Sequence, residues 1–312
     1  MLTSAAKGVY IISATPFDDD GRIDTASTDR LIDFYKESGV DGITILGMMG
    51  EAPKLDAAEA QSFVKQVVGR VRALPVIVGI SASGFAAMRA LAQSSMDAGA
   101  SGVMIAPPGA VRTDDQIVNY YADAVSAIGA SIPFVIQDYP LSTGVVMATA
   151  VIERIVANHP SCVMLKHEDW PGLEKISAVR KAQTDGRMRH ISILTGNGGL
   201  FLDFEMSRGA DGAMTGYAFP EMLVGVCRLM SQSKRDAAHD MFDAHLPLVR
   251  YEQQPGAGLA VRKYVLKRRG IIASDAQRKP GGALSAAARA EVDYLLARLA
   301  RSEPAAAKLL AG

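Results

Sequence analysis

The amino-acid sequence predicts an α/β protein, a single (β/α)8 TIM barrel with a C-terminal helical extension. Short runs rich in β-branched residues recur eight times along the chain, and amphipathic helical patterns separate them. Several runs are continuously apolar, which is typical of parallel strands covered on both faces. The eight predicted strands are Val9–Ala14, Gly42–Leu46, Pro75–Ile80, Gly102–Ala106, Pro133–Asp138, Cys162–Lys166, Ile191–Thr195 and Gly212–Thr215.

The segments between these runs carry signals for helix starts. Asp24-Thr-Ala-Ser precedes an apolar pattern that begins at Leu31, and Thr113-Asp-Asp-Gln precedes Ile117. An open, doubly wound sheet is the alternative to a closed barrel. No Gly-x-Gly-x-x-Gly motif follows the first predicted strand, where a dinucleotide-binding unit of that fold would carry it. The pattern therefore favours the barrel.

The last 80 or so residues show no strand pattern. They contain three helical stretches, Asp236–Leu248, Gly258–Arg269 and Ser285–Ala300. The loop that starts at Glu252 lacks the composition of a linker. We therefore expect a catalytic barrel over residues 1–230 and a helical extension over residues 231–312 that packs on the barrel.

Composition excludes several classes of protein. Lys plus Arg and Asp plus Glu number 33 each, so no net charge draws the chain to nucleic acid or to an anionic membrane. The basic run Lys267-Arg268-Arg269 ends a predicted helix, where cations are favoured for structural reasons. Cys162 and Cys227 lie in apolar runs without metal-ligand spacing. The sequence shows no signal peptide and no membrane span, so we expect a cytoplasmic protein.

Lys166 is the leading candidate for chemistry. Active sites of such barrels lie at the carboxyl ends of the strands, and Lys166 ends the sixth predicted strand. A lysine flanked by core residues is partly desolvated, which favours the neutral amine that can attack a ketone. The structural alternative is a lysine that only emerges into solvent at a strand end.

The loop Gly47-Met48-Met49-Gly50-Glu51 follows the second predicted strand. Its two glycines permit a tight turn that brings backbone N–H groups toward a ligand, and such a turn can bind a carboxylate. An ordinary loop between strand and helix is the alternative.

Taken in order along residues 8 to about 230, these motifs resemble the dihydrodipicolinate synthase and N-acetylneuraminate lyase family. The loop Gly47–Glu51 resembles that family's Gly-Thr-Thr-Gly-Glu loop, and Thr15-Pro16-Phe17 resembles its Thr-Pro-Phe signature. Asp138-Tyr-Pro140 with Thr143-Gly144 resembles the family's fifth-strand segment, and Lys166 falls on its Schiff-base lysine.

The resemblance implies a class I lyase in which Lys166 condenses with the C2 carbonyl of pyruvate or another 2-keto acid. The iminium then stabilises a carbanion at C3, which permits aldol addition, retro-aldol cleavage or loss of water. The N–H groups of Met48 and Met49 would hold the substrate carboxylate. The resemblance implies no metal and no other cofactor, and it suggests a homotetramer.

Departures from the family pattern narrow the activity. The family's fifth-strand tyrosine, which relays protons, is Gln137 here, and an amide cannot replace it. The arginine that binds the aldehyde carboxylate in dihydrodipicolinate synthases is Ser142. Gln137-Asp138-x-Pro140 and Lys166-x-Glu168 instead resemble 2-keto-3-deoxy-sugar-acid dehydratases, notably L-2-keto-3-deoxyarabonate dehydratase.

Other polar residues at the strand ends are candidates for the site. Glu168 shares a strand face with Lys166 and is the candidate general acid and base, unless it is a surface glutamate. Tyr139 offers a phenol or a packing aromatic ring. His167 alternates away from Lys166, toward a supporting layer or the surface. Gln137, Asn197 and Thr215 are candidates for substrate binding, and Tyr217 has the same standing as Thr215.

Three functions remain open from the sequence. The leading one is a Schiff-base lyase, most simply a 2-keto-3-deoxy-sugar-acid dehydratase or aldolase. The second is an authentic 4-hydroxy-tetrahydrodipicolinate synthase. The third, from another class, is a noncatalytic protein that binds keto acids or sugar acids.

Overall fold

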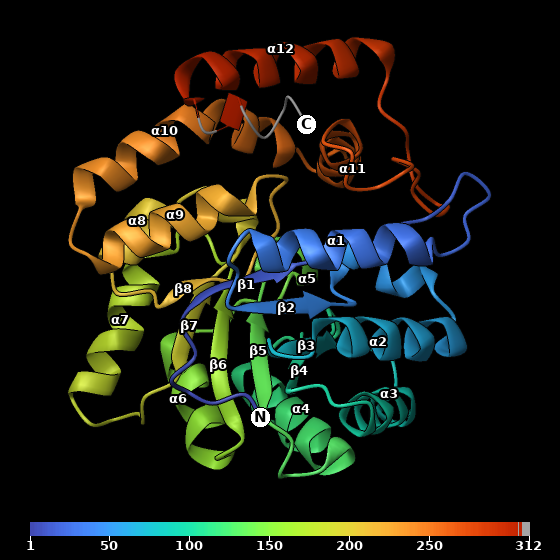
Figure 1. The fold of residues 1–312 in the computed structure, drawn as a ribbon. Coiled ribbons are helices and arrows are strands. Elements are labelled where there is room, and N and C mark those ends of the chain that lie inside the picture. The colour runs from blue at the N-terminus through green and yellow to red at the C-terminus, as the bar shows by residue number, and fades with distance from the viewer. Residues whose placement is uncertain (305, 308–312) are drawn as a thin grey trace.

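Eight parallel strands close into a barrel in the computed structural model, which describes residues 1–304 and 306–307 (Figure 1). Each strand pairs with the next along the chain, and β1 also pairs with β8, where Gly8 lies opposite Gly212. The closed barrel is confirmed, and the open doubly wound sheet is wrong. The strands are β1 (Gly8–Ile12), β2 (Gly42–Ile45), β3 (Val76–Gly79), β4 (Gly102–Ile105), β5 (Phe134–Asp138), β6 (Cys162–His167), β7 (Ser192–Thr195) and β8 (Gly212–Ala213).

Helices surround the barrel and continue beyond it (Figure 1). Two of the predicted starts are confirmed, because the side chain of Asp24 accepts from the Ser27 N–H and that of Thr113 accepts from the Gln116 N–H. The helices are α1 (Thr25–Glu37), α2 (Ala57–Val71), α3 (Phe85–Asp97), α4 (Asp114–Ile128), α5 (Pro140–Thr143), α6 (Thr149–Asn158), α7 (Leu173–Thr184), α8 (Leu202–Ser207), α9 (Pro220–Ser231), α10 (Arg235–Glu252), α11 (Gly258–Arg268) and α12 (Ala286–Ser302). Three 3-10 turns, Met48–Gly50, Ala52–Lys54 and Asn197–Gly199, lie in the loops after β2 and β7.

The barrel interior is filled by a cluster of inward apolar side chains. This layer includes Ile12, Met104, Val135, Met164 and Leu194, whereas the outward residues of the same strands pack against the helices. Side chains alternate along a strand, so residues two positions beyond an inward one point into the barrel as well. A residue at the carboxyl end of a strand therefore points into the barrel mouth if it lies two positions beyond an inward residue.

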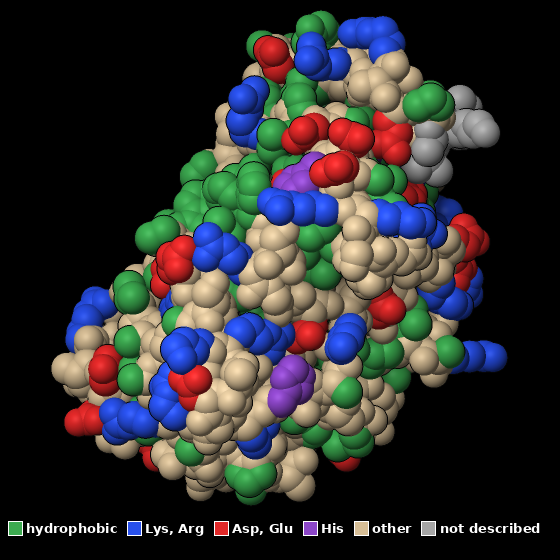
Figure 2. All heavy atoms as spheres, turned by 90° about the vertical axis from the view of Figure 1, so that its left-hand side faces the viewer, with side chains coloured by type: hydrophobic (Ala, Val, Ile, Leu, Met, Phe, Trp, Pro, Cys, Tyr) green, Lys and Arg blue, Asp and Glu red, His purple; other side chains and the backbone are tan. Residues whose placement is uncertain are grey.

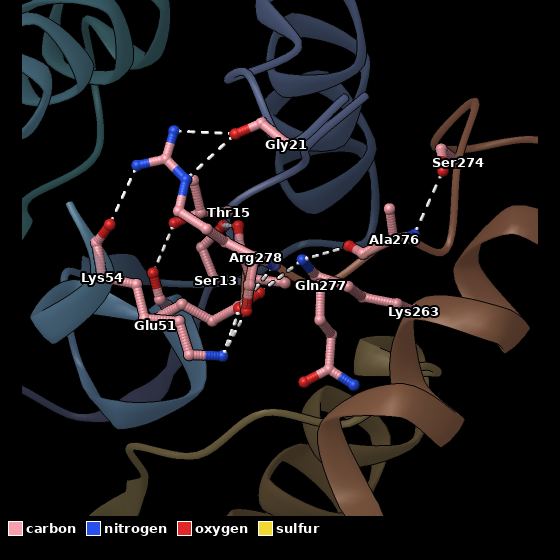
Figure 3. A network of polar contacts seen from close by, with 12 residues as sticks. Ser13, Thr15, Gly21, Glu51, Lys54, Lys263, Ser274, Ala276, Gln277 and Arg278 are labelled. Atoms are coloured by element: carbon pink, nitrogen blue, oxygen red, sulfur yellow. Dashed lines mark hydrogen bonds and ion pairs between the residues drawn. The ribbon is translucent and has the colours of Figure 1, made fainter. Parts of the chain in front are cut away.

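The C-terminal extension is formed by α10, α11 and α12, which lie together above α1 and α9 in Figure 1. All three predicted helical stretches are confirmed. Arg278, in the segment between α11 and α12, donates to both carboxylate oxygens of Glu59. It also donates to the carbonyl of Gly21 (Figure 3). These contacts tie the extension to α2 and to the loop after β1.

Charged side chains of both signs are interspersed on the face that Figure 2 shows. The basic run at the end of α11 has structural partners: Lys267 pairs with Asp275, and Arg269 pairs with Glu221 and packs over the ring of Phe219. Both cysteines are free and buried. Among the described residues, no helix combines the length and the apolar character that crossing a membrane requires.

Candidate active site

A cavity of about 160 Å³ lies at the carboxyl ends of the barrel strands. Most of its walls come from the ends of β1, β2, β5, β6, β7 and β8 and the loops that follow them, and two residues come from the C-terminal extension. The lining residues are Ile12, Met48, Met49, Gln137, Tyr139, Ser142, Lys166, Glu168, Asn197, Gly198, Thr215, Gly216, Gln253 and Arg262.

Lys166 and Glu168 form an ion pair at this cavity. Lys166 follows the inward residue Met164 by two positions, and its Nζ lies 2.7 Å from Oε2 of Glu168. Each of the two residues is only 5% exposed. The same Oε2 accepts from Nε2 of Gln137 at 3.0 Å. The lysine is thus desolvated as predicted, and its ammonium has a carboxylate partner.

The backbone fixes where Glu168 points. Its N–H donates to the carbonyl of Asp138 at 2.8 Å, which extends the pairing of β5 and β6 by one residue. A Cβ atom at Gly196 would lie 2.3 Å from the Glu168 side chain, so only glycine leaves room for the carboxylate. The expectation that Glu168 shares the face of Lys166 is confirmed, and the surface alternative is wrong.

Three further residues that the sequence predicted for substrate binding lie at the cavity. Gln137, Asn197 and Thr215 line the cavity. The Nδ2 of Asn197 donates to the backbone carbonyl of Glu168 at 3.0 Å, and its N–H donates to Oε1 of Glu168 at 3.3 Å. Asn197 therefore holds Glu168 in place in this structure, in addition to lining the cavity.

The loop after β2 places Met48 and Met49 on the cavity wall, whereas Gly47 precedes the 3-10 turn and is not part of the lining. The sequence predicted that the two glycines would permit the tight turn, but other residues adopt its left-handed backbone conformation. The left-handed residues are Leu46 (φ 54°) and Glu51 (φ 56°), and Gly47 has an ordinary φ of −80°. A non-glycine residue in this conformation is costly and must be held by its surroundings.

Glu51 is held by a buried polar network (Figure 3). Its carboxylate accepts from Nζ of Lys263 at 2.6 Å, from Nζ of Lys54 at 2.8 Å and from the N–H of Arg278 at 3.1 Å. Burial lowers the pKa of Lys263, and the Glu51 carboxylate opposes that effect. The C-terminal extension therefore fixes the end of the loop that carries Met48 and Met49.

Tyr139 lines the cavity as a half-buried side chain. Burial raises its pKa, and the nearby Glu168 carboxylate adds to the rise, so the phenol keeps its proton at neutral pH. His167 is not at the surface but buried, and its Nε2 lies 3.1 Å from the carbonyl oxygen of Gly172.

The candidate Tyr217 is wrong, because it does not line the cavity. Its ring is buried against Phe219, and its hydroxyl lies 3.0 Å from Nδ1 of His245 in α10. Thr215 and Gly216 line the cavity, but the side chain of Tyr217 packs toward α10 instead, so the strand-end position does not bring the phenol to the site.

Sequence reasoning missed three residues near the site. Gln253 and Arg262 reach the cavity from the extension, and Glu205 of α8 is buried, with its pKa raised by burial to about 7. Arg262 left a signal in the sequence: it lies in the run Ala260–Leu266, in which every residue is buried. An arginine on a helix that is buried on all sides must have specific partners.

The sequence matches one protein family over most of its length. The sequence profile described as the dihydrodipicolinate synthetase family matches residues 5–299. The L-2-keto-3-deoxyarabonate dehydratase of Azospirillum brasilense is 29% identical over 305 residues, which cover 95% of this chain and 96% of that protein. The 4-hydroxy-tetrahydrodipicolinate synthase of Chlorobium luteolum is also 29% identical, over 298 residues that cover 94% and 97% of the two chains.

A solved structure is similar over nearly the whole chain. The crystal structure of dihydrodipicolinate synthase from Rhodopseudomonas palustris superposes with a TM-score of 0.94 at 62% sequence identity. The match covers 95% of this chain and 99% of that one.

Proposed function

The chain belongs to the dihydrodipicolinate synthetase family and is a lyase, and on that premise we propose that it forms a Schiff base between Lys166 and the C2 carbonyl of a 2-keto acid. The observation that carries the proposal is the buried pair of Lys166 Nζ and Glu168 Oε2, 2.7 Å apart in a cavity at the barrel mouth. Active sites of this fold lie at that end.

The pair supports the first step chemically. Glu168 is within hydrogen-bond distance of Nζ, so it can accept the proton that Lys166 must lose before it attacks the carbonyl carbon. Attack gives a carbinolamine, and protonation of its hydroxyl releases water and leaves the iminium. The iminium accepts the electron pair of a C3 carbanion, which is the common intermediate of dehydration and retro-aldol cleavage.

We infer that the substrate is a 2-keto-3-deoxy sugar acid, converted by dehydration or by aldol cleavage. Dehydration removes a C3 proton and expels the C4 hydroxyl as water, so one group must first act as a base and then as an acid. Glu168 is the one carboxylate among the cavity-lining residues of the described chain. Tyr139 is the second candidate, because its protonated phenol lines the same cavity.

Authentic 4-hydroxy-tetrahydrodipicolinate synthase activity is the alternative, and the 62% identity to the Rhodopseudomonas palustris structure favours it. Ser142 speaks against it. This residue lines the cavity where the sequence pattern expects an arginine for the aldehyde carboxylate, and its Oγ contacts Met48 Sδ at 3.1 Å. A hydroxyl there cannot form the bidentate, charged contact that an arginine forms with a carboxylate.

One substrate panel separates these activities. The purified protein is incubated with 2-keto-3-deoxy acids of five and six carbons, and separately with pyruvate plus aspartate semialdehyde, and the products are identified. We expect product from a 2-keto-3-deoxy acid and none from the aspartate semialdehyde reaction. The Lys166→Ala variant is the control for every arm. Efficient condensation of aspartate semialdehyde would refute the dehydratase or aldolase assignment.

We also propose a homotetramer. Trp170, Phe201 and Phe204 are exposed by 43%, 38% and 45%, and the rings of Trp170 and Phe201 meet edge to face at 5.6 Å. Hydrophobic side chains gather on the face shown in Figure 2. Exposed apolar patches mark contact surfaces between proteins. Light scattering should give four times the monomer mass, and a concentration-independent monomer would refute the assembly.

A further inference from the structure

Arg262 of α11 brings a guanidinium from the C-terminal extension to the wall of the Lys166 cavity. Its Nε donates to Oε1 of Glu252 at 2.6 Å, and its Nη2 donates to the carbonyl of Gly216 at 2.6 Å. The residue is 2% exposed, and its Nη1 donates to no acceptor among the described residues. One nitrogen of this guanidinium is therefore buried and left without a partner among the described residues.

A buried donor without an acceptor is rare in folded proteins and is destabilising unless a ligand satisfies it. Glu252 engages Arg262 through Nε, so the Glu252 contact does not use Nη1. Guanidinium is the side-chain group best suited to bind a carboxylate. The unsatisfied nitrogen points to an oxygen-bearing anion as the missing partner.

Gly216 shows how closely the guanidinium approaches the end of β8. A Cβ atom at this position would lie 1.9 Å from Nη1 of Arg262, so any larger residue would displace the guanidinium. Gly216 and its neighbour Thr215 both line the cavity. The chain thus leaves a side chain out at position 216 and lets the guanidinium occupy that space.

The residue next to Arg262 connects α11 to the loop after β2. Lys263 binds Glu51 at 2.6 Å, and Glu51 directly follows the 3-10 turn that carries Met48 and Met49. The guanidinium and this turn are therefore fixed to each other through one helix. Both line the same small cavity, in which the threonine hydroxyls of the family pattern are replaced by methionine side chains.

We propose that Nη1 of Arg262 donates to the carboxylate of the 2-keto acid and thereby positions the C2 carbonyl at Lys166. This inference rests on the proposed Schiff-base function. The charged side chains that line the cavity or pair with its arginine are Lys166, Arg262, Glu168 and Glu252, two of each sign, so no excess negative charge repels the acid. The site then selects 2-keto acids over uncharged ketones.

The test compares trapping of two ketones by borohydride reduction, read by mass spectrometry over a range of concentrations. Pyruvate carries the carboxylate, whereas methyl pyruvate carries the same reactive ketone as an uncharged ester. Because removal of the arginine alone would leave Glu252 buried without a partner, the guanidinium is removed in the double variant Arg262→Gln/Glu252→Gln. Glu252→Gln, which keeps the guanidinium, is the reference.

We expect the double variant to need roughly 10- to 100-fold more pyruvate than the reference for half-maximal trapping, the loss typical of a charged hydrogen bond. Its trapping by methyl pyruvate should change by less than about threefold. Gly216→Ala, which displaces Nη1, should likewise weaken trapping of pyruvate and leave trapping of methyl pyruvate nearly unchanged. Arg269→Gln removes another buried arginine at the end of α11, which does not line the cavity. It should leave trapping of both ketones unchanged.

Trapping distinguishes failure of the Schiff base at Lys166 from failure of the Arg262 contact. If wild-type protein forms no adduct with pyruvate at any concentration, both the Schiff base and the role of Arg262 are overturned. If wild-type protein is trapped but the double variant and its reference need the same pyruvate concentration, Arg262 is not the anchor, and the Schiff base stands. An equal loss of trapping by pyruvate and by methyl pyruvate also overturns the role in carboxylate binding.

Discussion

Glu168→Gln should separate formation of the Schiff base from turnover. The amide keeps the size of the carboxylate and can still accept from the N–H of Asn197, but it cannot take up or release a proton. Glu168 is the one carboxylate that lines the cavity within the described chain, so no second acid is placed to replace it directly. Turnover should fall by roughly 10²- to 10⁴-fold, the range for a positioned acid or base.

That loss corresponds to a barrier higher by about 3 to 5 kcal/mol. The assay has two readouts on the same protein: steady-state turnover of the substrate found in the panel, and borohydride trapping of pyruvate on Lys166 after a long incubation. Trapping should approach the wild-type extent. Asp169→Asn is the matched control, because Asp169 follows directly in the sequence but pairs with Lys175 outside the cavity lining. Normal turnover by Glu168→Gln would refute the role of Glu168 and direct attention to Tyr139.

Three further outcomes follow from the same geometry. Lys166→Ala should abolish turnover while the protein keeps its fold, and Lys166→Arg should be equally inactive because guanidinium stays protonated; more than about a tenth of the wild-type rate in either variant would contradict the assignment. The pKa of Glu205 is raised from 4.5 to about 7 by burial, so its contribution is present below pH 4.5 and is lost as the pH rises through 7. Glu205→Gln should therefore be more stable than wild type at pH 8 by up to about 3 kcal/mol in chemical denaturation, and an equal or lower stability would contradict this. Pyruvate soaked into crystals should be bonded to Lys166 with its carboxylate toward the N–H groups of Met48 and Met49, and a carboxylate at the opposite wall would contradict the orientation.

The barrel could be predicted because its signal is local. Eight apolar runs at regular spacing each form one strand, and the alternation of side chains after Met164 correctly directs Lys166 and Glu168 into the barrel. Boundaries were less accurate. The run Gly212–Thr215 contains a strand of only two residues, Gly212–Ala213, although the N–H of Met214 still donates to the carbonyl of Thr195 and the carbonyl of Thr215 still accepts from the N–H of Ile12.

The part of the site that depends on distant packing could not be predicted. Arg262 and Lys263 reach the barrel mouth through the docking of α11, and no pattern near Lys166 indicates which helix will cover it. The prediction that Tyr217 lies at the site was wrong for a related reason. Its strand-end position does not indicate that its hydroxyl will lie beside His245 of α10 in the core. Strand periodicity fixes the direction of a side chain only while the chain remains extended.

Covalent trapping on the native protein shows directly whether Lys166 forms a Schiff base. The protein is incubated with pyruvate, reduced with borohydride and digested, and the modified peptide is sequenced by mass spectrometry. We expect a single reduced pyruvate adduct, located on Lys166 and absent from Lys166→Ala. No adduct across pyruvate and a panel of other 2-keto acids would contradict it and favour a protein that binds keto acids without covalent chemistry, and an adduct on another lysine would contradict the assignment of the site.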